Sequence, residues 1–279
     1  MTKTGPYVIA TAAHNEENDL ERTIVSVTKQ TILPIRWCIV SDGSTDGTDE
    51  IIKKYASKYT WINYLRREKS EEEKKRIEKA SPGKAMAIKL AYEIIKSINF
   101  KYFANLDADV KLTPKYYEMI INEFELDKKL GIGGGAVRCI LPNGEIAPGG
   151  FFKKSFVGGP VQMFRRECYE EIGGYRPYGH DDCIAGDMAI KKGWKMKNFL
   201  HIVVDHYVPD KGYAPTIKSK IPTTFYLGQM HYISREKWWI EIARSLKRMY
   251  YKPYILAGAS MLCGYLWAAI KKKKKIPRE

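Results

Sequence analysis

Two aspartates separated by one small residue, Asp107 and Asp109, have the spacing of a metal-binding pair. They follow the apolar run 102–106 and face one loop across Ala108. Carboxylates this close repel each other unless a cation neutralises them, and hard oxygen ligands suit Mg²⁺ or Mn²⁺ bound to a diphosphate. A single D-x-D is common and can also be a loop turn or a helix cap before Pro114. Its position at the end of a fourth predicted strand favours the metal site.

A second acidic loop contains Asp42, within the segment SDGSTDGT. A carboxylate at this position can accept hydrogen bonds from a base imide or a ribose hydroxyl. Helix capping by Ser44, Thr45 or Asp46 is an alternative. Both roles can hold, because the cap and the ligand contact use different residues of the loop.

A third acidic segment ends in Asp181 and Asp182, after the glycine- and aromatic-rich sequence GGYRPYGH. A carboxylate in a cleft beside bound phosphate is a suitable general base for deprotonating a hydroxyl. Aspartate also caps helices, which is the competing interpretation because a helical pattern follows.

Alternating apolar runs and helical patterns determine where these loops lie. Strands that alternate with helices imply an α/β sheet with right-handed crossovers. Such sheets bind ligands at the carboxyl ends of their strands, where this chain places its aspartates. The predicted strands are 7–12, 35–41, 61–65 and 102–106, and the predicted helices include 18–30, a helix through 51–55, and 82–98.

The segment from Leu130 to Val208 has a less regular pattern. Glycine lets the backbone turn sharply or approach a ligand closely, and we expect that role of the clusters at 133–135, 149–150 and 158–159. Helices are predicted at 166–172 and 184–192, and a strand at 196–204.

The C-terminal section differs in composition. Residues 234–251 predict an amphipathic interfacial helix, and residues 254–270 form an uncharged, largely apolar stretch followed by five lysines, Lys271 to Lys275. A stretch of about 17 residues is the lower limit for crossing a bilayer. A peripheral attachment, a single crossing, and a helix packed on the body with a solvated basic tail therefore remain alternatives.

The charge of the chain points to a polyanionic partner. The 279 residues are 44% apolar and carry a net charge of +15, and residues 235–279 hold 12 basic against three acidic residues. No nucleic-acid-binding motif is recognised, so we expect an anionic membrane surface and no nucleic acid. Five cysteines without a C-x-x-C pair are expected to be reduced, and the N-terminus lacks a secretory signal pattern. These features predict a cytoplasmic body at the cytoplasmic face of the cell membrane.

Taken together, the motifs resemble the family 2 glycosyltransferases, which have the nucleotide-sugar-binding fold called GT-A. The resemblance runs from Tyr7 to about Val204, and its strength lies in the order and spacing of motifs that are weak one by one. The segments that carry it are VIATAAHNEENDLERTIVSVTKQT, CIVSDGSTDGT, SPGKAMAIKLAYE, LDADV and FRRECYEEIGGYRPYGHDDCIAGDMAIKKGWK.

The resemblance implies roles for individual residues. Asp182 falls at the position of the catalytic base, with Asp181 in place of the usual glutamate before it. Asp109 falls at the metal-ligand position, and His206 could complete that site, as a histidine does in some enzymes of this fold; an ordinary structural histidine is the alternative. Ser41 departs from the acidic pair that the family usually has. The implied nucleotide-sugar-binding residues are Thr11, Ala13, Glu16, Asp42, Gly83, Lys84, Asp107 and Ala108.

The resemblance also implies a reaction: metal-dependent, inverting transfer of sugar from a nucleotide donor to an acceptor, here a glycan or a lipid-linked precursor. Processive synthases of the family carry a Q-x-x-R-W element, whereas Gln229, Arg235 and Trp238 have the wrong spacing, so a single addition is favoured. A sugar nucleotidyltransferase is the nearest other enzyme, but it needs a glycine-rich loop where this chain has TAAHNEE. A basic membrane- or nucleic-acid-binding module is the non-enzymatic alternative.

We therefore predict an α/β, GT-A type, Rossmann-like and mostly parallel sheet flanked by helices, with a C-terminal amphipathic and hydrophobic helical extension. The catalytic domain is predicted at 1–210, with a nucleotide-binding half at 1–110 and an acceptor-side half at 111–210. Residues 211–279 are predicted to be a helical membrane-associating region with a polylysine tail.

Overall fold

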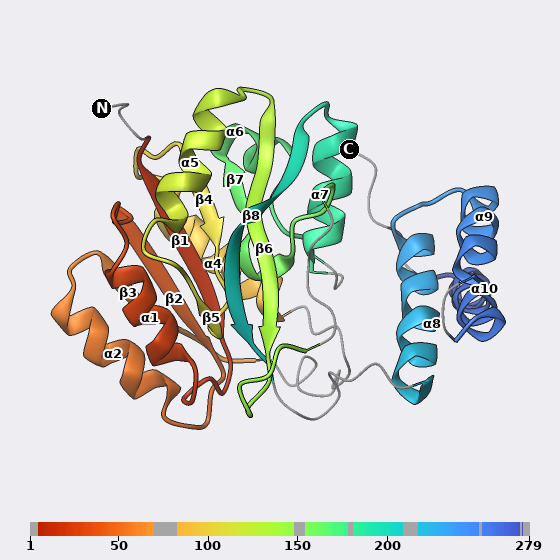
Figure 1. Cartoon of the computed structure of the whole chain (residues 1–279), viewed down its shortest axis with the longest axis horizontal. Coiled ribbons are helices and arrows are strands. Elements are labelled where there is room, and N and C mark those ends of the chain that lie inside the picture. The colour runs from red at the N-terminus through yellow and green to blue at the C-terminus, as the bar shows by residue number, and fades with distance from the viewer. Residues whose placement is uncertain are drawn as a thin grey trace. The chain divides into compact units, whose positions relative to one another are not determined.

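The computed structural model shows two compact units, Met1–Val208 and Pro209–Glu279. The first unit is an eight-stranded sheet with helices on both faces, and the second is helical (Figure 1). The division of the first unit into nucleotide-binding and acceptor-side halves stays a prediction. The structure describes residues 5–69, 83–147, 154–177, 181–208, 217–250, 253–273 and 275.

Four parallel strands form one side of the sheet, in the order β3-β2-β1-β4. Side chains of β1 and β2 are buried on both faces, as expected of parallel strands covered by helices. The carboxyl ends of β1, β2 and β4 therefore meet at one edge of the sheet. The strands are β1 (Tyr7–Ala13), β2 (Arg36–Asp42), β3 (Ile62–Arg67) and β4 (Tyr102–Asn105).

The helices that cover this half bury one stripe of residues each. In α1 (Leu20–Thr28), Leu20, Ile24 and Val27 recur at helical spacing and are fully buried. Helix α4 (Gly83–Ile95) packs on β1 and β2 through small and branched residues. The remaining helices here are α2 (Thr48–Lys58) and α5 (Tyr116–Leu126).

The other half of the sheet is mixed. Strand β7 (Met163–Arg165) runs antiparallel to both β4 and β6 (Leu130–Ile140), so β6 points the same way as β4. Strand β8 (Lys195–Tyr207) is parallel to β6, and β5 (Val110–Lys111) closes the sheet antiparallel to β8. The end of β8 thus lies at the same edge of the sheet as the end of β4.

The glycines at 133–135 lie inside strand β6 and not in a turn or a ligand loop, so that prediction was wrong. A Cβ atom at Gly133 would lie 2.9 Å from the ring of Phe124, and one at Gly134 would lie 2.7 Å from the carbonyl oxygen of Val161. Glycine is required here because neighbouring elements press on both faces of the strand. The cluster at 149–150 falls outside the described residues.

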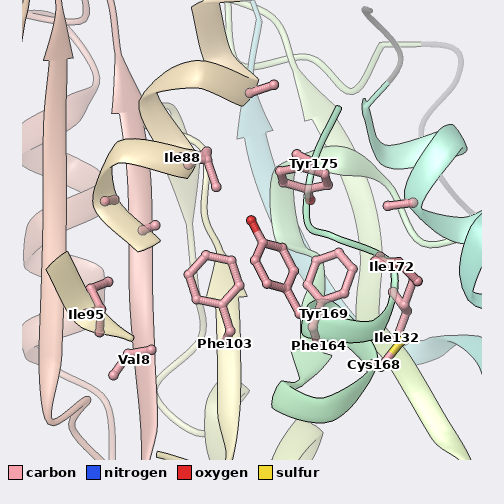
Figure 2. Packing of buried hydrophobic residues seen from close by; sticks show 14 of the residues in the cluster. Val8, Ile88, Ile95, Phe103, Ile132, Phe164, Cys168, Tyr169, Ile172 and Tyr175 are labelled. Atoms are coloured by element: carbon pink, nitrogen blue, oxygen red, sulfur yellow. The ribbon is translucent and has the colours of Figure 1, made fainter. Parts of the chain in front are cut away.

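Helices α6 (Arg166–Glu171) and α7 (Asp181–Lys191) complete the first unit. The buried rings of Phe103, Phe164 and Tyr169 pack together on the α4 side of the sheet, with Tyr175 above them (Figure 2). Helix α7 begins three residues earlier than predicted, so both of its aspartates lie in its first turn.

The second unit contains α8 (Ile217–Ile233), α9 (Trp238–Arg248) and α10 (Ile255–Ile270). The last two confirm the helices predicted at 234–251 and 254–270, whereas α8 was not predicted. In the part of the chain that the structure describes, no helix combines the length and apolarity needed to cross a membrane.

Candidate active site

Lys84 and Asp107 form an ion pair at the carboxyl edge of the sheet. Lys84 lies in the first turn of α4, and Asp107 follows β4. Burial lowers the pKa of Lys84, but the charge of Asp107, with smaller contributions from Asp182 and Asp181, raises it above its ordinary value. Lys84 is therefore a fixed positive charge at a helix N-terminus, which is a favourable place for a phosphate group.

Backbone hydrogen bonds hold the carboxylate of Asp182 on both sides. The nitrogen of Gly159 donates to Oδ2 at 3.0 Å, and the nitrogen of Cys183 donates to Oδ1 at 2.8 Å. A Cβ atom at position 159 would lie 3.0 Å from Asp182 Oδ2, so glycine permits this approach. The carbonyl of Gly159 in turn accepts a 2.6 Å hydrogen bond from the Asn105 side chain, which ties α7 to the end of β4.

These groups share one cavity of about 270 Å³. The Lys84–Asp107 ion pair lies on one side of this cavity, and the acidic first turn of α7 lies on the other. A candidate phosphate site and a candidate base are therefore neighbours. Tyr175 forms part of the wall, and its hydroxyl donates a 2.6 Å hydrogen bond to Gln162. The cavity is lined by Lys84, Asp107, Gly159, Pro160, Tyr175, Asp181 and Asp182.

Asp109 and His206 meet where β5 pairs with β8. Residue 110 is the register partner of His206, and Asp109 Oδ2 lies 3.0 Å from His206 Nε2. Burial lowers the pKa of His206, but the hydrogen bond and charge of Asp109 outweigh it and raise the pKa to about 10. Asp109 therefore favours the protonated form of His206, and a metal ion that bound this nitrogen would have to displace its proton.

The chemistry of this pair fits a divalent metal ion. Asp109 Oδ1 is buried without a hydrogen-bond partner among the described residues, and an imidazole nitrogen lies beside the other oxygen. Carboxylate and imidazole suit Mn²⁺ or a similar ion. Within the described ranges, no three His, Cys, Asp or Glu side chains are placed to hold an ion together. A metal at this point would need further ligands, such as diphosphate oxygens and water.

The pKa of Glu16, in the loop after β1, reflects the negative charge of this region. Burial raises its pKa, as do the charges of Asp109, Asp19, Asp107 and Asp46, in that order, to about 8. Both aspartates of the D-x-D element therefore act on Glu16. Such a concentration of acidic groups favours a bound cation.

Asp42 lies at the end of β2 and is almost completely buried. Arg67, its register partner on β3, holds Oδ1 through Nε at 2.6 Å and Nη2 at 2.5 Å. Sequence reasoning missed Arg67, although its position at the end of a parallel neighbour of the Asp42 strand was a usable signal. Among the described residues, the lining of the 270 Å³ cavity includes Asp182 but neither Asp42 nor Asp109.

The remaining predicted nucleotide-sugar residues are mostly interior. The Thr11 hydroxyl is fully buried and accepts a 3.0 Å hydrogen bond from the indole of Trp37, so the structure does not bring it into the cavity. Ala13 ends β1. Ala108 is buried, and its carbonyl accepts a 2.6 Å hydrogen bond from Thr23. Gly83, finally, is the first residue of α4.

Comparisons with known proteins agree with this architecture. Residues 8–193 match the family model described as Glycosyl transferase family 2. Chondroitin synthase from Pasteurella multocida (strain Pm70) is 29% identical over 139 residues, which are 50% of this chain and only 13% of that protein.

Solved structures share the fold at low identity. The mannosyltransferase PcManGT from Pyrobaculum calidifontis, in complex with GDP-Man and Mn²⁺, has a TM-score of 0.58 and 18% identity, with 99% of this chain and 78% of that chain covered. GalNAc-T7 with UDP, GalNAc and Mn²⁺ has a TM-score of 0.61 and 16% identity, with 84% and 51% covered. These neighbours confirm the predicted GT-A fold. With two thirds of its length matched by the family model, the chain belongs to glycosyl transferase family 2.

Proposed function

We propose that this glycosyltransferase moves a single sugar, with inversion at the sugar carbon, from a nucleotide-sugar donor to a glycan acceptor. The observation that carries the proposal is the shared cavity, in which the Lys84–Asp107 pair faces the carboxylate of Asp182. A phosphate site and a candidate base then lie on opposite sides of the space that a reacting sugar would occupy. Binding and proton transfer are thereby assigned to different elements of the fold.

In this proposal, Lys84 contacts the diphosphate of the donor and Asp42 contacts the nucleoside. Lys84 keeps its charge, and the N-terminus of α4 adds the favourable end of a helix dipole. Arg67 holds one carboxylate oxygen of Asp42 and so fixes the orientation of the carboxylate, whose other oxygen lies 4.0 Å from Lys69 Nζ. The donor is thus held along the carboxyl edge of the parallel strands.

Asp109 and His206 are the residues that would hold a divalent cation, Mg²⁺ or Mn²⁺. When bound, such an ion supplies charge neutralisation for a departing nucleoside diphosphate. The two solved neighbours contain Mn²⁺, which supports the choice of ion. The buried Asp109 Oδ1, without a partner among the described residues, supports the site.

Asp182 is proposed to act as the general base. Its carboxylate takes the proton of the acceptor hydroxyl while that oxygen bonds to the sugar carbon and the bond from this carbon to the diphosphate oxygen breaks. The two backbone donors that hold the carboxylate keep it oriented. Asp181, in the same first turn, lines the cavity and adds negative charge.

The acceptor is proposed to be a lipid-linked glycan or polysaccharide precursor at the cytoplasmic face of the membrane. The basic C-terminal section supports this location, and the absence of a correctly spaced Q-x-x-R-W element in the sequence supports a single addition. The matched region is a small part of the chondroitin synthase, so the acceptor of that protein carries little weight here.

A thermal-shift screen of nucleoside diphosphates and nucleotide sugars with Mn²⁺ or Mg²⁺ tests the proposal, because a donor that binds only the folded state raises Tm. We expect a nucleotide sugar to raise Tm in the presence of the ion. No shift with any nucleotide sugar would contradict the proposed function.

A further inference from the structure

Helix α9 is inverted relative to an ordinary surface helix: it buries polar residues and exposes apolar ones. Glu241 and Ser245 are fully buried, and His231 Nδ1 lies 2.5 Å from Glu241 Oε2. Trp238 is 62% exposed and Trp239 is 51% exposed. A helix that buries a glutamate and exposes tryptophans has the properties of an interaction surface on its exposed side.

The exposed apolar residues of α9 form one stripe, which we call the α9 apolar arc. Its members are Trp238, Trp239, Ile242 and Leu246, and the last two are 38% and 55% exposed. At about 100° per residue, the four positions fall within an arc of about 100°. The arc is therefore a continuous surface and not a scatter of single exposed residues.

Packing within the second unit explains why the arc is left outside. A Cβ atom added at Gly258 of α10 would lie only 2.3 Å from the carbonyl oxygen of Ser245 in α9. The backbones of α9 and α10 are therefore in close contact on the Ser245 side of α9. Helices α8 and α10 meet in the same way at Gly228 and Gly264. These close contacts leave no place for tryptophan side chains between the helices.

The net charge of the second unit favours an anionic partner. Residues 209–279 hold 15 basic against four acidic residues, so this quarter of the chain carries +11 of the net charge of +15. The acidic residues near α9 are not free at its surface, because Glu241 is buried against His231 and Glu236 pairs with Arg244 at 3.0 Å. Repulsion between like charges disfavours a second copy of the chain on this face.

We propose that the α9 apolar arc inserts into the interfacial region of an anionic lipid membrane, with α9 lying parallel to the surface. Tryptophans suit the boundary between headgroups and acyl chains, and Lys247, which follows Leu246, lies at the edge where lipid phosphates would be. Lys237 stacks over the ring of Trp239 at 5.0 Å, which adds a charge at that boundary. The inference rests on the proposed function, in which the acceptor is a lipid-linked glycan at a membrane. It identifies the part of the protein that would bind that membrane.

Flotation of the full chain with lipid vesicles tests the proposal. We expect binding to phosphatidylcholine vesicles that contain phosphatidylglycerol, weaker binding to pure phosphatidylcholine, and weakening by salt. Trp238→Ser combined with Trp239→Ser should lower the partition coefficient about tenfold or more. Lys247→Gln should lower it about fivefold.

Leu126→Ser is the matched control, because Leu126 is 83% exposed in the first unit and should not affect vesicle binding. Equal melting temperatures would show that the variants fold. Vesicle binding that is unchanged in the tryptophan variant, or a wild type that ignores vesicles and forms a dimer lost in that variant, would overturn the proposal. Donor-induced thermal shifts, measured without vesicles, should be the same in wild type and the tryptophan variant. Their absence in both would refute the proposed function while leaving membrane docking intact.

Discussion

The carboxylate of Asp182 lies 3.0 Å from the backbone nitrogen of Gly159, which precedes the strand that pairs with β4. The side chain of Asn105, at the end of β4, donates to the carbonyl of the same glycine, so Gly159 links the first turn of α7 to β4. The position of the proposed base therefore depends on a residue that has no side chain. This dependence can be tested by adding a single methyl group.

Gly159→Ala should reduce kcat without a comparable loss of donor affinity. The added Cβ would lie 3.0 Å from Asp182 Oδ2 and 3.3 Å from its Cβ, so the carboxylate must move. We expect a fall in kcat of about threefold to tenfold, since a misplacement of about 1 Å costs about a hundredfold and the shift needed here is a few tenths of an ångström. Steady-state kinetics, with the donor Kd from calorimetry, measure the two quantities separately. An unchanged kcat would show that this contact does not position the base.

Asp109→Ala and His206→Ala should each raise the Mn²⁺ concentration needed for half-maximal activity by about tenfold or more. Each change removes one of the two side chains that would hold the ion. His201→Ala is the control, because His201 lies on the same strand and is exposed. If all three variants had the same Mn²⁺ dependence as wild type, Asp109 and His206 would not be the metal ligands.

The acid stability of the first unit should depend on Glu125. Burial raises the pKa of this carboxyl, but hydrogen bonds from Lys101, Lys128 and Tyr102 outweigh it and lower the pKa to about 2 from 4.5. A depressed pKa in the folded state contributes stability that is present above pH 4.5 and is lost as the pH falls toward 2. The free energy of unfolding should fall less over this window in Glu125→Gln. If the free energy of unfolding fell equally with pH in wild type and Glu125→Gln, this role of Glu125 would be contradicted.

Much of the fold could be predicted from sequence because its signals are local. The apolar runs of β1, β2 and β4 form strands that are almost entirely buried, and each ends in a loop where sequence analysis placed candidate residues. Strands β5 and β7, with two and three residues, are too short to show a period. Strand β6 was missed because its glycines read as a turn, although packing by Phe124 and its neighbours requires them.

The acidic residues of the site were predicted from the sequence, but the residues that hold their carboxylates in place were not. Arg67 reaches Asp42 only because β2 and β3 pair in a particular register, and Gly159 reaches Asp182 across 23 positions of the chain. The contact of Gly159 leaves no pattern in a single sequence, whereas the position of Arg67 after the predicted strand that follows the Asp42 strand was a signal that could have been used. Of Asp42, Asp109 and Asp182, which sequence analysis placed in three acidic loops, the described lining of the 270 Å³ cavity includes only Asp182.

The most direct test of the account compares donor affinity and turnover in Asp182→Asn and Asp109→Ala, with Asp187→Asn on the same helix as control. With Mn²⁺ present, calorimetry should give Asp182→Asn a donor Kd near that of wild type, while its kcat falls about a hundredfold to ten-thousandfold. Asp109→Ala should lose donor affinity itself. Equal losses of donor affinity in these two variants, or normal turnover by Asp182→Asn, would contradict the division of the site into a donor-binding edge and a base.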